Sequence, residues 1–134
     1  MVNAFNNGLG RHDFLQGNIP FDTSQGDTYF ASVPAPRDYN TDRTKAAAVN
    51  DIVSLNIVLN SGAGLSDKGL FGTVNTMYRP VGDLFLSIRK DAAPYTEVGL
   101  FKISANGEAK TYFYSGVPSY GIFINGHYPV KAHA

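Results

Sequence analysis

Histidine side chains are the first candidates for chemistry in this chain, and they are few and dispersed. They are His12, His127 and His133, and none has another His, Asp or Glu two or four positions away. Those are the spacings that place two ligands on one face of a strand or a helix. The chain has no cysteine, which excludes disulfides and thiolate metal sites. We therefore expect polar histidines without a metal, and no other cofactor.

The carboxylates of the second half of the chain give no stronger sign of catalysis. Most of them fall at expected strand ends or turns, where acidic residues cap and solvate the backbone; they are Asp51, Asp67, Asp83, Asp91, Glu97 and Glu108. A glycosidase-like acid pair would have to come from separate strands. Neither a GxSxG elbow nor a phosphate-binding P-loop occurs. The sequence predicts a protein that is not an enzyme.

Three aromatic residues are more informative, because alternation places them opposite the expected core. They are Phe85, Tyr112 and Tyr114. Large exposed aromatic side chains commonly mark an interface or a sugar-stacking surface. The alternative is a two-layer fold that buries both faces of the sheet. If the residues are exposed, we expect a subunit or partner surface rather than a ligand site, because the neighbouring polar groups look too sparse for sugar recognition.

The elements that position these residues are short strands separated by turns. Alternating apolar residues predict strands over 51–60, 70–74, 83–89, 96–104, 108–115 and 120–124, and a closing strand over 127–130. Asn106-Gly107 predicts a tight hairpin with both central residues at positive φ, and Asn125-Gly126 predicts a second turn. Gly99 predicts a bulge or a close backbone approach. The fold class is all-β, an antiparallel sandwich of the jelly-roll type.

Residues 1–50 differ from this pattern and predict an extended, irregular N-terminal arm or linker before a sandwich domain at 51–134. Turn residues dominate there, and the scattered apolar residues Phe5, Phe14, Leu15, Ile19 and Phe21 are candidate anchors on another surface. The alternative is a loop-rich first part of the same sandwich. Thr41–Val49 is the one helix candidate, because it holds three alanines after a possible capping residue.

Composition limits the partners. Lys plus Arg and Asp plus Glu number 11 each, so the formal net charge is zero, which argues against nucleic acid as the main partner. Aromatic residues reach 13% while charged residues are only 16%, which favours strands over helices. No apolar run approaches the ~20 residues of a membrane span, and no signal-peptide pattern opens the chain. We expect no membrane insertion.

The stretch from Met77 to Val130 resembles the C-terminal head domains of phage tail-fibre, baseplate and head-fibre proteins. The resemblance is carried by Tyr78-Arg79-Pro80 before a strand, by Ile103-Ser-Ala-Asn106-Gly107-Glu108, and by Ile122-Phe-Ile124-Asn-Gly126-His-Tyr128. It covers roughly residues 50–130. The shaft that usually precedes such heads is missing, and the irregular arm stands in its place.

The resemblance implies a small jelly-roll-like sandwich that packs as a trimer about a three-fold axis. We therefore expect a virion structural protein of the capsid-decoration or head-fibre type, assembled in the host cytoplasm and held on the particle by its arm. Its expected partners are copies of itself and other virion proteins such as the major capsid protein. The alternative is a receptor- or glycan-binding tip domain of a phage tail or baseplate, with a host-surface glycan as partner.

Overall fold

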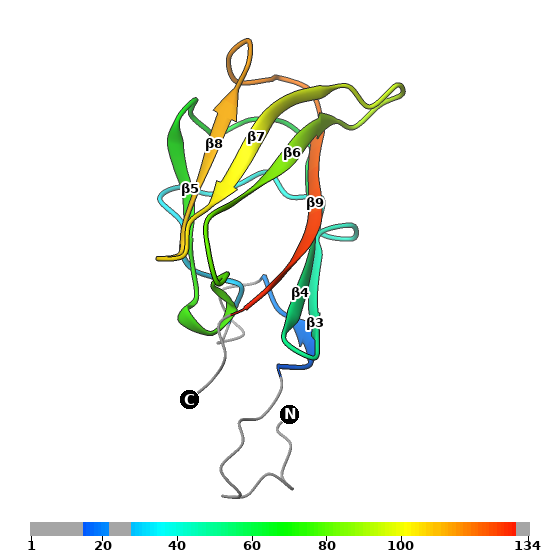
Figure 1. Cartoon of the computed structure of the whole chain (residues 1–134). Coiled ribbons are helices and arrows are strands. Elements are labelled where there is room, and N and C mark those ends of the chain that lie inside the picture. The colour runs from blue at the N-terminus through cyan, green and yellow to red at the C-terminus, as the bar shows by residue number, and fades with distance from the viewer. Residues whose placement is uncertain (1–14, 22–27, 131–134) are drawn as a thin grey trace, which may run out of the picture.

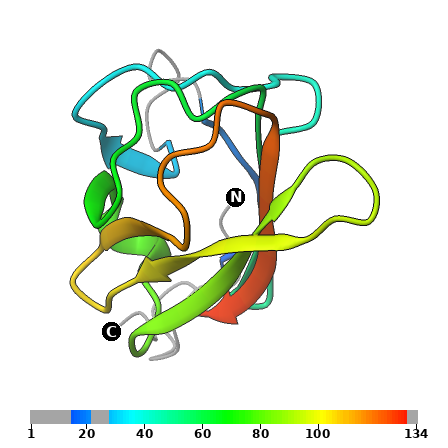
Figure 2. The same ribbon diagram turned by 90° about the horizontal axis from the view of Figure 1, so that it is seen from above.

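The computed structural model describes residues 15–21 and 28–130, and these residues form a nine-stranded antiparallel sheet (Figure 1). The spatial order is β1-β3-β4-β9-β6-β7-β8-β5-β2. The bounds are β1 Gly17–Ile19, β2 Phe30–Ser32, β3 Lys45–Val49, β4 Ile52–Leu59, β5 Gly69–Val74, β6 Leu84–Lys90, β7 Glu97–Ile103, β8 Glu108–Phe113 and β9 Ile122–Pro129. Seen from above, the sheet curls around its core as a half-barrel (Figure 2). The all-β, antiparallel expectation is confirmed.

The core is built by the alternation that predicted the strands. In β4, the side chains of Val53, Leu55 and Ile57 point inward and are almost fully buried, and the whole strand pairs with β9. In β8, Thr111 and Phe113 are buried in the same way. Apolar side chains on one face of a strand must leave water together, so the sheet curls to enclose them.

The β7–β8 hairpin forms at Asn106-Gly107 as expected, but with a different turn. Only Gly107 has a positive φ, +97°, and the Gly107 amide donates to the Ser104 carbonyl. The Ser104 amide donates in turn to the Glu108 carbonyl, which leaves three residues in the loop. This is a type I turn followed by a glycine bulge, and the expectation of two positive φ angles was wrong.

The expected helix at Thr41–Val49 was also wrong, because residues 45–49 form β3. Ala46 and Ala48 alternate into the core and are buried, and β3 pairs with β1 on one side and β4 on the other. Asn50 and Asp51 both have positive φ and make the two-residue turn to β4. Three alanines favour a helix locally, but ladder hydrogen bonds on both sides outweigh that weak preference. The expected boundary after residue 50 lies inside this turn.

Asn125-Gly126 was expected to turn the chain, and that prediction was wrong as well. Both residues lie in the middle of β9 and pair with Asn56 and Leu55 of β4. A Cβ on Gly126 would lie 2.5 Å from the Leu86 Cδ2 atom, so glycine makes room for a side chain from β6. The prediction for Gly99 is confirmed. A Cβ there would lie 2.2 Å from the Tyr112 carbonyl oxygen, and the β6–β7 register shifts beside it.

The segment 33–44 connects β4 with β5, which belong to opposite halves of the strand order. At one end, the Asn40 amide donates to the Val58 carbonyl of β4. At the other, the Arg37 guanidinium donates to the Leu70 and Phe71 carbonyls of β5 and stacks 4.8 Å from the Phe71 ring centroid. This segment and β1 to β3 therefore belong to the same folded unit as the rest of the sheet.

Three tyrosines form a buried hydrogen-bond relay inside the sheet. The Tyr128 hydroxyl donates to the Tyr78 carbonyl at 2.7 Å, and the Tyr29 and Tyr128 hydroxyl oxygens are 2.7 Å apart. Tyr128 has one hydroxyl proton and gives it to the carbonyl, so Tyr29 is the donor in the second bond. Burial raises the pKa of both Tyr29 and Tyr128. The relay links residues that lie 99 positions apart.

Candidate functional site

The three predicted surface aromatic residues lie on the outer face of the β6–β7–β8 sheet, at three different levels along the strands; each level is a row of residues paired across neighbouring strands. The first row, toward the Asn106-Gly107 end, contains Phe85 and its partner Lys102. The second pairs Leu100 with Tyr112, and Tyr114 follows at the far end of β8. Phe85 and Tyr114 are 56% and 59% exposed, whereas Tyr112 is half-buried. All three point away from the core as predicted, but they do not form one cluster.

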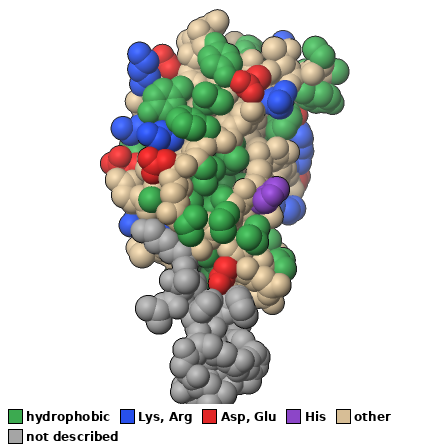
Figure 3. All heavy atoms as spheres, viewed as in Figure 1, with side chains coloured by type: hydrophobic (Ala, Val, Ile, Leu, Met, Phe, Trp, Pro, Cys, Tyr) green, Lys and Arg blue, Asp and Glu red, His purple; other side chains and the backbone are tan. Residues whose placement is uncertain are grey.

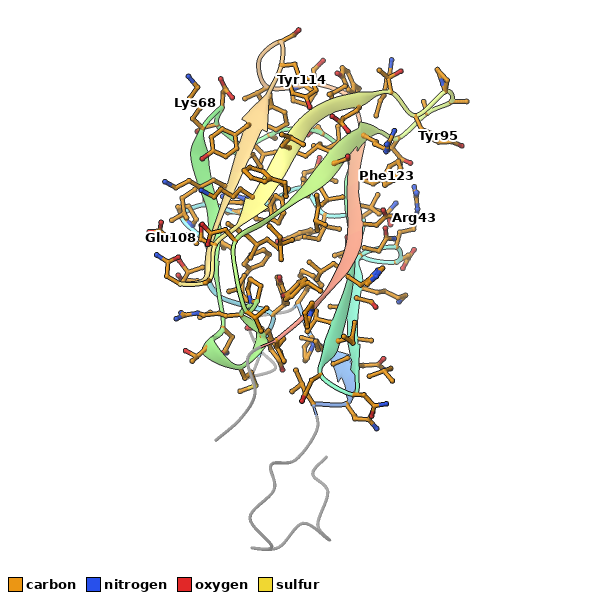
Figure 4. All side chains as sticks on the ribbon, viewed as in Figure 1. Arg43, Lys68, Tyr95, Glu108, Tyr114 and Phe123 are labelled. Atoms are coloured by element: carbon orange, nitrogen blue, oxygen red, sulfur yellow. The ribbon has the colours of Figure 1, made fainter. Side chains whose placement is uncertain are left out.

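Glu97 is the centre of a polar cluster that includes Tyr114 and joins neighbouring parts of β6, β7 and β8. Glu97, the first residue of β7, accepts a hydrogen bond from the Ser87 hydroxyl of β6 at 2.5 Å through Oε1. Its other oxygen, Oε2, accepts a hydrogen bond from the Tyr114 hydroxyl. Figure 4 shows Tyr114 at the upper end of the sheet, while Glu108 marks the opposite end of β8. Both carboxylate oxygens are thus fixed in place by protein donors.

These hydrogen bonds keep Glu97 ionised. Donation from Ser87, then from Tyr114, lowers the pKa of the Glu97 carboxyl, and the nearby Arg89 guanidinium acts in the same direction. The same bond to Glu97 raises the pKa of the Tyr114 hydroxyl. A lowered pKa favours the ionised form of Glu97, which accepts hydrogen bonds, and makes this carboxyl poorly suited to act as a general acid.

A hollow of about 440 Å³ opens beside this cluster. One wall is the start of β7, and the other is the loop between β8 and β9; the lining residues are Thr96, Glu97, Val98, Tyr114, Ser115, Gly116, Val117, Pro118, Ser119 and Tyr120. Hydrophobic side chains also lie over the upper part of the molecule, with charged groups among them (Figure 3). Glu97 is the one carboxylate in this lining, so the hollow offers an acceptor, hydroxyls and aromatic rings rather than an acid–base pair.

Two further aromatic residues are exposed in this part of the molecule: Tyr120, which lines the hollow, and Tyr95 of the β6–β7 hairpin. Tyr120 is 39% exposed and carries the Lys90 ammonium 4.8 Å from its ring centroid. Tyr95, at the tip of the β6–β7 hairpin, is half exposed and packs edge-on against Phe123 of β9. Aromatic rings therefore gather at this end of the sheet.

The candidate arm anchors separate into two groups. Leu15, Ile19 and Phe21 pack against the core of their own chain. Leu15 is also held by the β3–β4 turn, since its amide donates to the Asp51 carboxylate at 2.6 Å. Phe5 and Phe14 lie outside the described residues, as do His12 and His133.

Metal binding has no support in the part of the chain that is described. Within residues 15–21 and 28–130, no three His, Asp or Glu side chains gather into a metal-binding group, and His127 is an exposed residue of β9. In the same residues, no helix is long and apolar enough to cross a membrane.

Sequence reasoning missed Glu97, Ser87 and Tyr120, and with them the polar surroundings of Tyr114. The exact hairpin register decides this contact. The three-residue loop at 105–107 pairs Gly99 with Phe113, whereas the expected two-residue turn would have paired Gly99 with Tyr114. The observed register brings Glu97 within hydrogen-bond reach of Tyr114. The residues that line the hollow beside Tyr114 include Thr96, Ser115 and Ser119, so more hydroxyl-bearing residues lie here than the sequence indicated.

Comparison of the chain with protein-family models, with curated proteins and with solved structures found no match in any of the three.

Proposed function

We propose that this chain is a non-enzymatic phage virion protein, a trimeric subunit of the capsid-decoration or head-fibre type. The sequence resemblance over residues 77–130 supports it, and its two best motifs meet in the fold. The Arg79 side chain donates to the Val74 carbonyl at 2.9 Å and lies against Gly107 so closely that a Cβ there would be 2.4 Å from Nε. The corner and the turn thus form one structural unit.

We also propose that the curled sheet is a form of the jelly-roll-like sandwich. The ladder between its two halves, β1-β3-β4-β9 and β6-β7-β8-β5-β2, is short: Ile88–Lys90 of β6 pairs with Ile122–Ile124 of β9, and an isolated bridge joins Pro80 with Val130. Beyond this short junction, the Leu86 side chain of β6 lies against Gly126 of β9, at the place where the β6–β9 ladder would otherwise continue. Two halves joined by so short a ladder are close to two sheets facing each other across a core.

The observation that carries the oligomer proposal is the exposed outer face around Phe85. Phe85 is 56% exposed, and the hollow beside it, about 360 Å³, is lined largely by apolar residues such as Val81, Leu84 and Pro129. Covering the exposed part of this ring removes about 100 Å² of apolar surface, which contributes about 2.5 kcal/mol per protomer. The Lys102 Nζ and Asp83 Oδ2 atoms are 3.9 Å apart, and these two side chains form a charged rim beside the apolar surface around Phe85.

The test compares two exposed apolar residues by analytical ultracentrifugation. Phe85→Ser is expected to shift a trimer toward monomer, and Tyr112→Ser on the same face is expected to weaken it less. Val49→Ser is the matched control, because Val49 is 63% exposed but lies at the end of β3, outside this face. Equal effects of Phe85→Ser and Val49→Ser would exclude the Phe85 face as the subunit interface.

We propose that the particle anchor lies in residues 1–14, with Phe5 and Phe14 as its apolar contacts. Removal of residues 1–48 would delete β1, β2 and nearly all of β3, and would take buried Tyr29 and Phe30 from the core. A deletion of residues 1–14 leaves every described strand intact. This truncated protein is expected to keep its oligomeric state and to lose binding to particles assembled without the chain. Unchanged particle binding would place the anchor elsewhere.

The second candidate function is a receptor- or glycan-binding tip domain of a phage tail or baseplate. The hollow between Glu97, Tyr114 and Tyr120 favours it, because exposed rings beside a fixed acceptor are suited to a ligand as well as to a subunit. The two candidates use opposite ends of the β6–β7–β8 face, so variants at Phe85 and at Tyr114 separate them.

A further inference from the structure

We infer that the hollow between the start of β7 and the β8–β9 loop is a binding site for an uncharged saccharide. It is defined by Glu97, Tyr114 and Tyr120 together with the hydroxyls of Thr96, Ser115 and Ser119. This inference gives a site to the second candidate function, but it stands on the side chains of the hollow and holds whether or not the chain is a virion protein.

The aromatic residues supply the apolar part of the site. Tyr114 is 59% exposed and Tyr120 is 39% exposed, so both keep ring surface open to solvent at the rim of the hollow. The apolar C–H face of a sugar ring stacks on such surfaces, as other flat apolar groups do. Neither ring is needed to fill the core, which leaves them available for a ligand.

The polar part of the site is a carboxylate whose direction is already set. Ser87 and Tyr114 each hold one oxygen of Glu97, so the carboxylate cannot rotate freely when a ligand arrives. Each carboxylate oxygen has two acceptor positions, and one protein donor leaves the second available for a sugar hydroxyl. A preorganised acceptor loses less entropy on binding than a mobile side chain does.

The loop that closes the hollow is fixed at three points. The Tyr114 amide donates to the Val98 carbonyl at 3.0 Å, which continues the β7–β8 ladder into the loop. The Pro118 carbonyl accepts from the Gly62 amide at 3.0 Å, and the Gly121 carbonyl accepts from the Asp91 amide at 2.9 Å. Pro118 is buried, although the residues on either side of it are exposed. The hollow is therefore shaped before any ligand binds.

The charges around the hollow favour a neutral ligand over a cation. Exposed tyrosines beside a carboxylate could also hold an ammonium group. Here the Lys90 ammonium already occupies the Tyr120 ring at 4.8 Å, and Arg89 is paired with Glu97 across the β6–β7 ladder. Glu97 is one negative side chain beside the two positive side chains Lys90 and Arg89, so the site gives no net attraction for a cation. The hydroxyl groups of a neutral sugar match the carboxylate acceptor and the hydroxyl groups that line the hollow.

The test is a titration of the full-length ¹⁵N-labelled chain with methyl glucoside, methyl galactoside and N-acetylglucosamine at millimolar concentrations. We expect at least one sugar to shift the amide signals of residues 96–98 and 114–121. Tyr114→Ala and Glu97→Gln should each weaken this binding about tenfold or more. Phe85→Ala, at the other end of the same face, should leave it unchanged, and unaltered signals elsewhere report that each variant is folded.

Three outcomes would overturn the inference. The first is no shift with any of the three sugars and no signal on an array of neutral glycans. The second is a set of shifts that lies outside the hollow or survives Tyr114→Ala. The third is a response to tetramethylammonium or glucuronate that exceeds the response to the neutral sugars, which would assign the hollow to a charged ligand. None of these results affects the tests of the Phe85 face or of residues 1–14.

Discussion

Replacing Tyr128 by phenylalanine tests the buried relay that joins Tyr29, Tyr128 and Tyr78. Tyr128→Phe removes the hydrogen bond to the Tyr78 carbonyl, which is worth about 0.5–1.5 kcal/mol. It also removes the acceptor of the Tyr29 hydroxyl, and a buried donor left without an acceptor costs about 1–3 kcal/mol. The free energy of unfolding should fall by about 1.5–4.5 kcal/mol in total, which corresponds to a Tm lower by roughly 5–18 °C for a domain of this size.

The direction of the relay predicts an asymmetry between its two hydroxyls. Tyr29→Phe removes one donor and leaves the bond from Tyr128 to the Tyr78 carbonyl intact, so it should cost only about 0.5–1.5 kcal/mol. The double variant should be no less stable than Tyr128→Phe, because it removes the stranded Tyr29 hydroxyl as well. Tyr95→Phe is the matched control at a half-exposed position and should change stability by less than about 0.5 kcal/mol.

Urea denaturation followed by far-ultraviolet circular dichroism measures all four variants. Two results would refute the reasoning: a Tyr29→Phe loss as large as that of Tyr128→Phe, or a Tyr128→Phe loss no larger than that of the Tyr95→Phe control.

Two further predictions concern the same core and its closing segment. The pKa of Tyr29, Tyr39 and Tyr128 is raised by burial, for Tyr39 to about 12, so the folded state binds more protons than the unfolded state above the ordinary tyrosine pKa. The free energy of unfolding should be level below about pH 10 and should fall above it, by up to about 1.4 kcal/mol per pH unit for each of these tyrosines. Urea midpoints that stay constant up to about pH 12, roughly two units above the ordinary tyrosine pKa, would contradict this. Arg37→Lys should cost about 1–3 kcal/mol in urea denaturation, because lysine cannot donate to the Ala35, Gly64, Leu70 and Phe71 carbonyls at once, whereas Arg89→Lys, which affects one carbonyl contact, should cost little. Equal costs at the two positions would argue against Arg37 as the tie between the loops and β5.

Local alternation was enough to predict most strands, because a half-buried strand must alternate. The 51–60 stretch is the clearest example: its apolar face is the inner face of β4. β3 was missed because its buried side chains are alanines, whose local preference is helical, and only the neighbouring strands decide against it. Asn125-Gly126 was misread because the same dipeptide that makes a turn also leaves space for Leu86 across a strand.

The candidate site was less accessible to sequence reasoning than the fold. The outward direction of Phe85, Tyr112 and Tyr114 followed from alternation alone. The meeting of Glu97 with Tyr114 required the exact register of the β7–β8 hairpin. It also depends on the bulge beside Gly99, which shifts the β6–β7 register by one residue. Tyr120 lies in the loop before β9, and its partner Lys90 is the last residue of β6. Their contact depends on the adjacency of β6 and β9 in the strand order, which no local sequence pattern encodes.

The central proposal is that this chain works as a self-assembling subunit rather than as a solitary domain. Native mass spectrometry of the full chain at micromolar concentration tests it most directly. We expect a dominant species of three chains that dissociates when Phe85 is replaced by serine. A monomer at every concentration, with a circular dichroism spectrum of a folded β protein, would contradict the proposal.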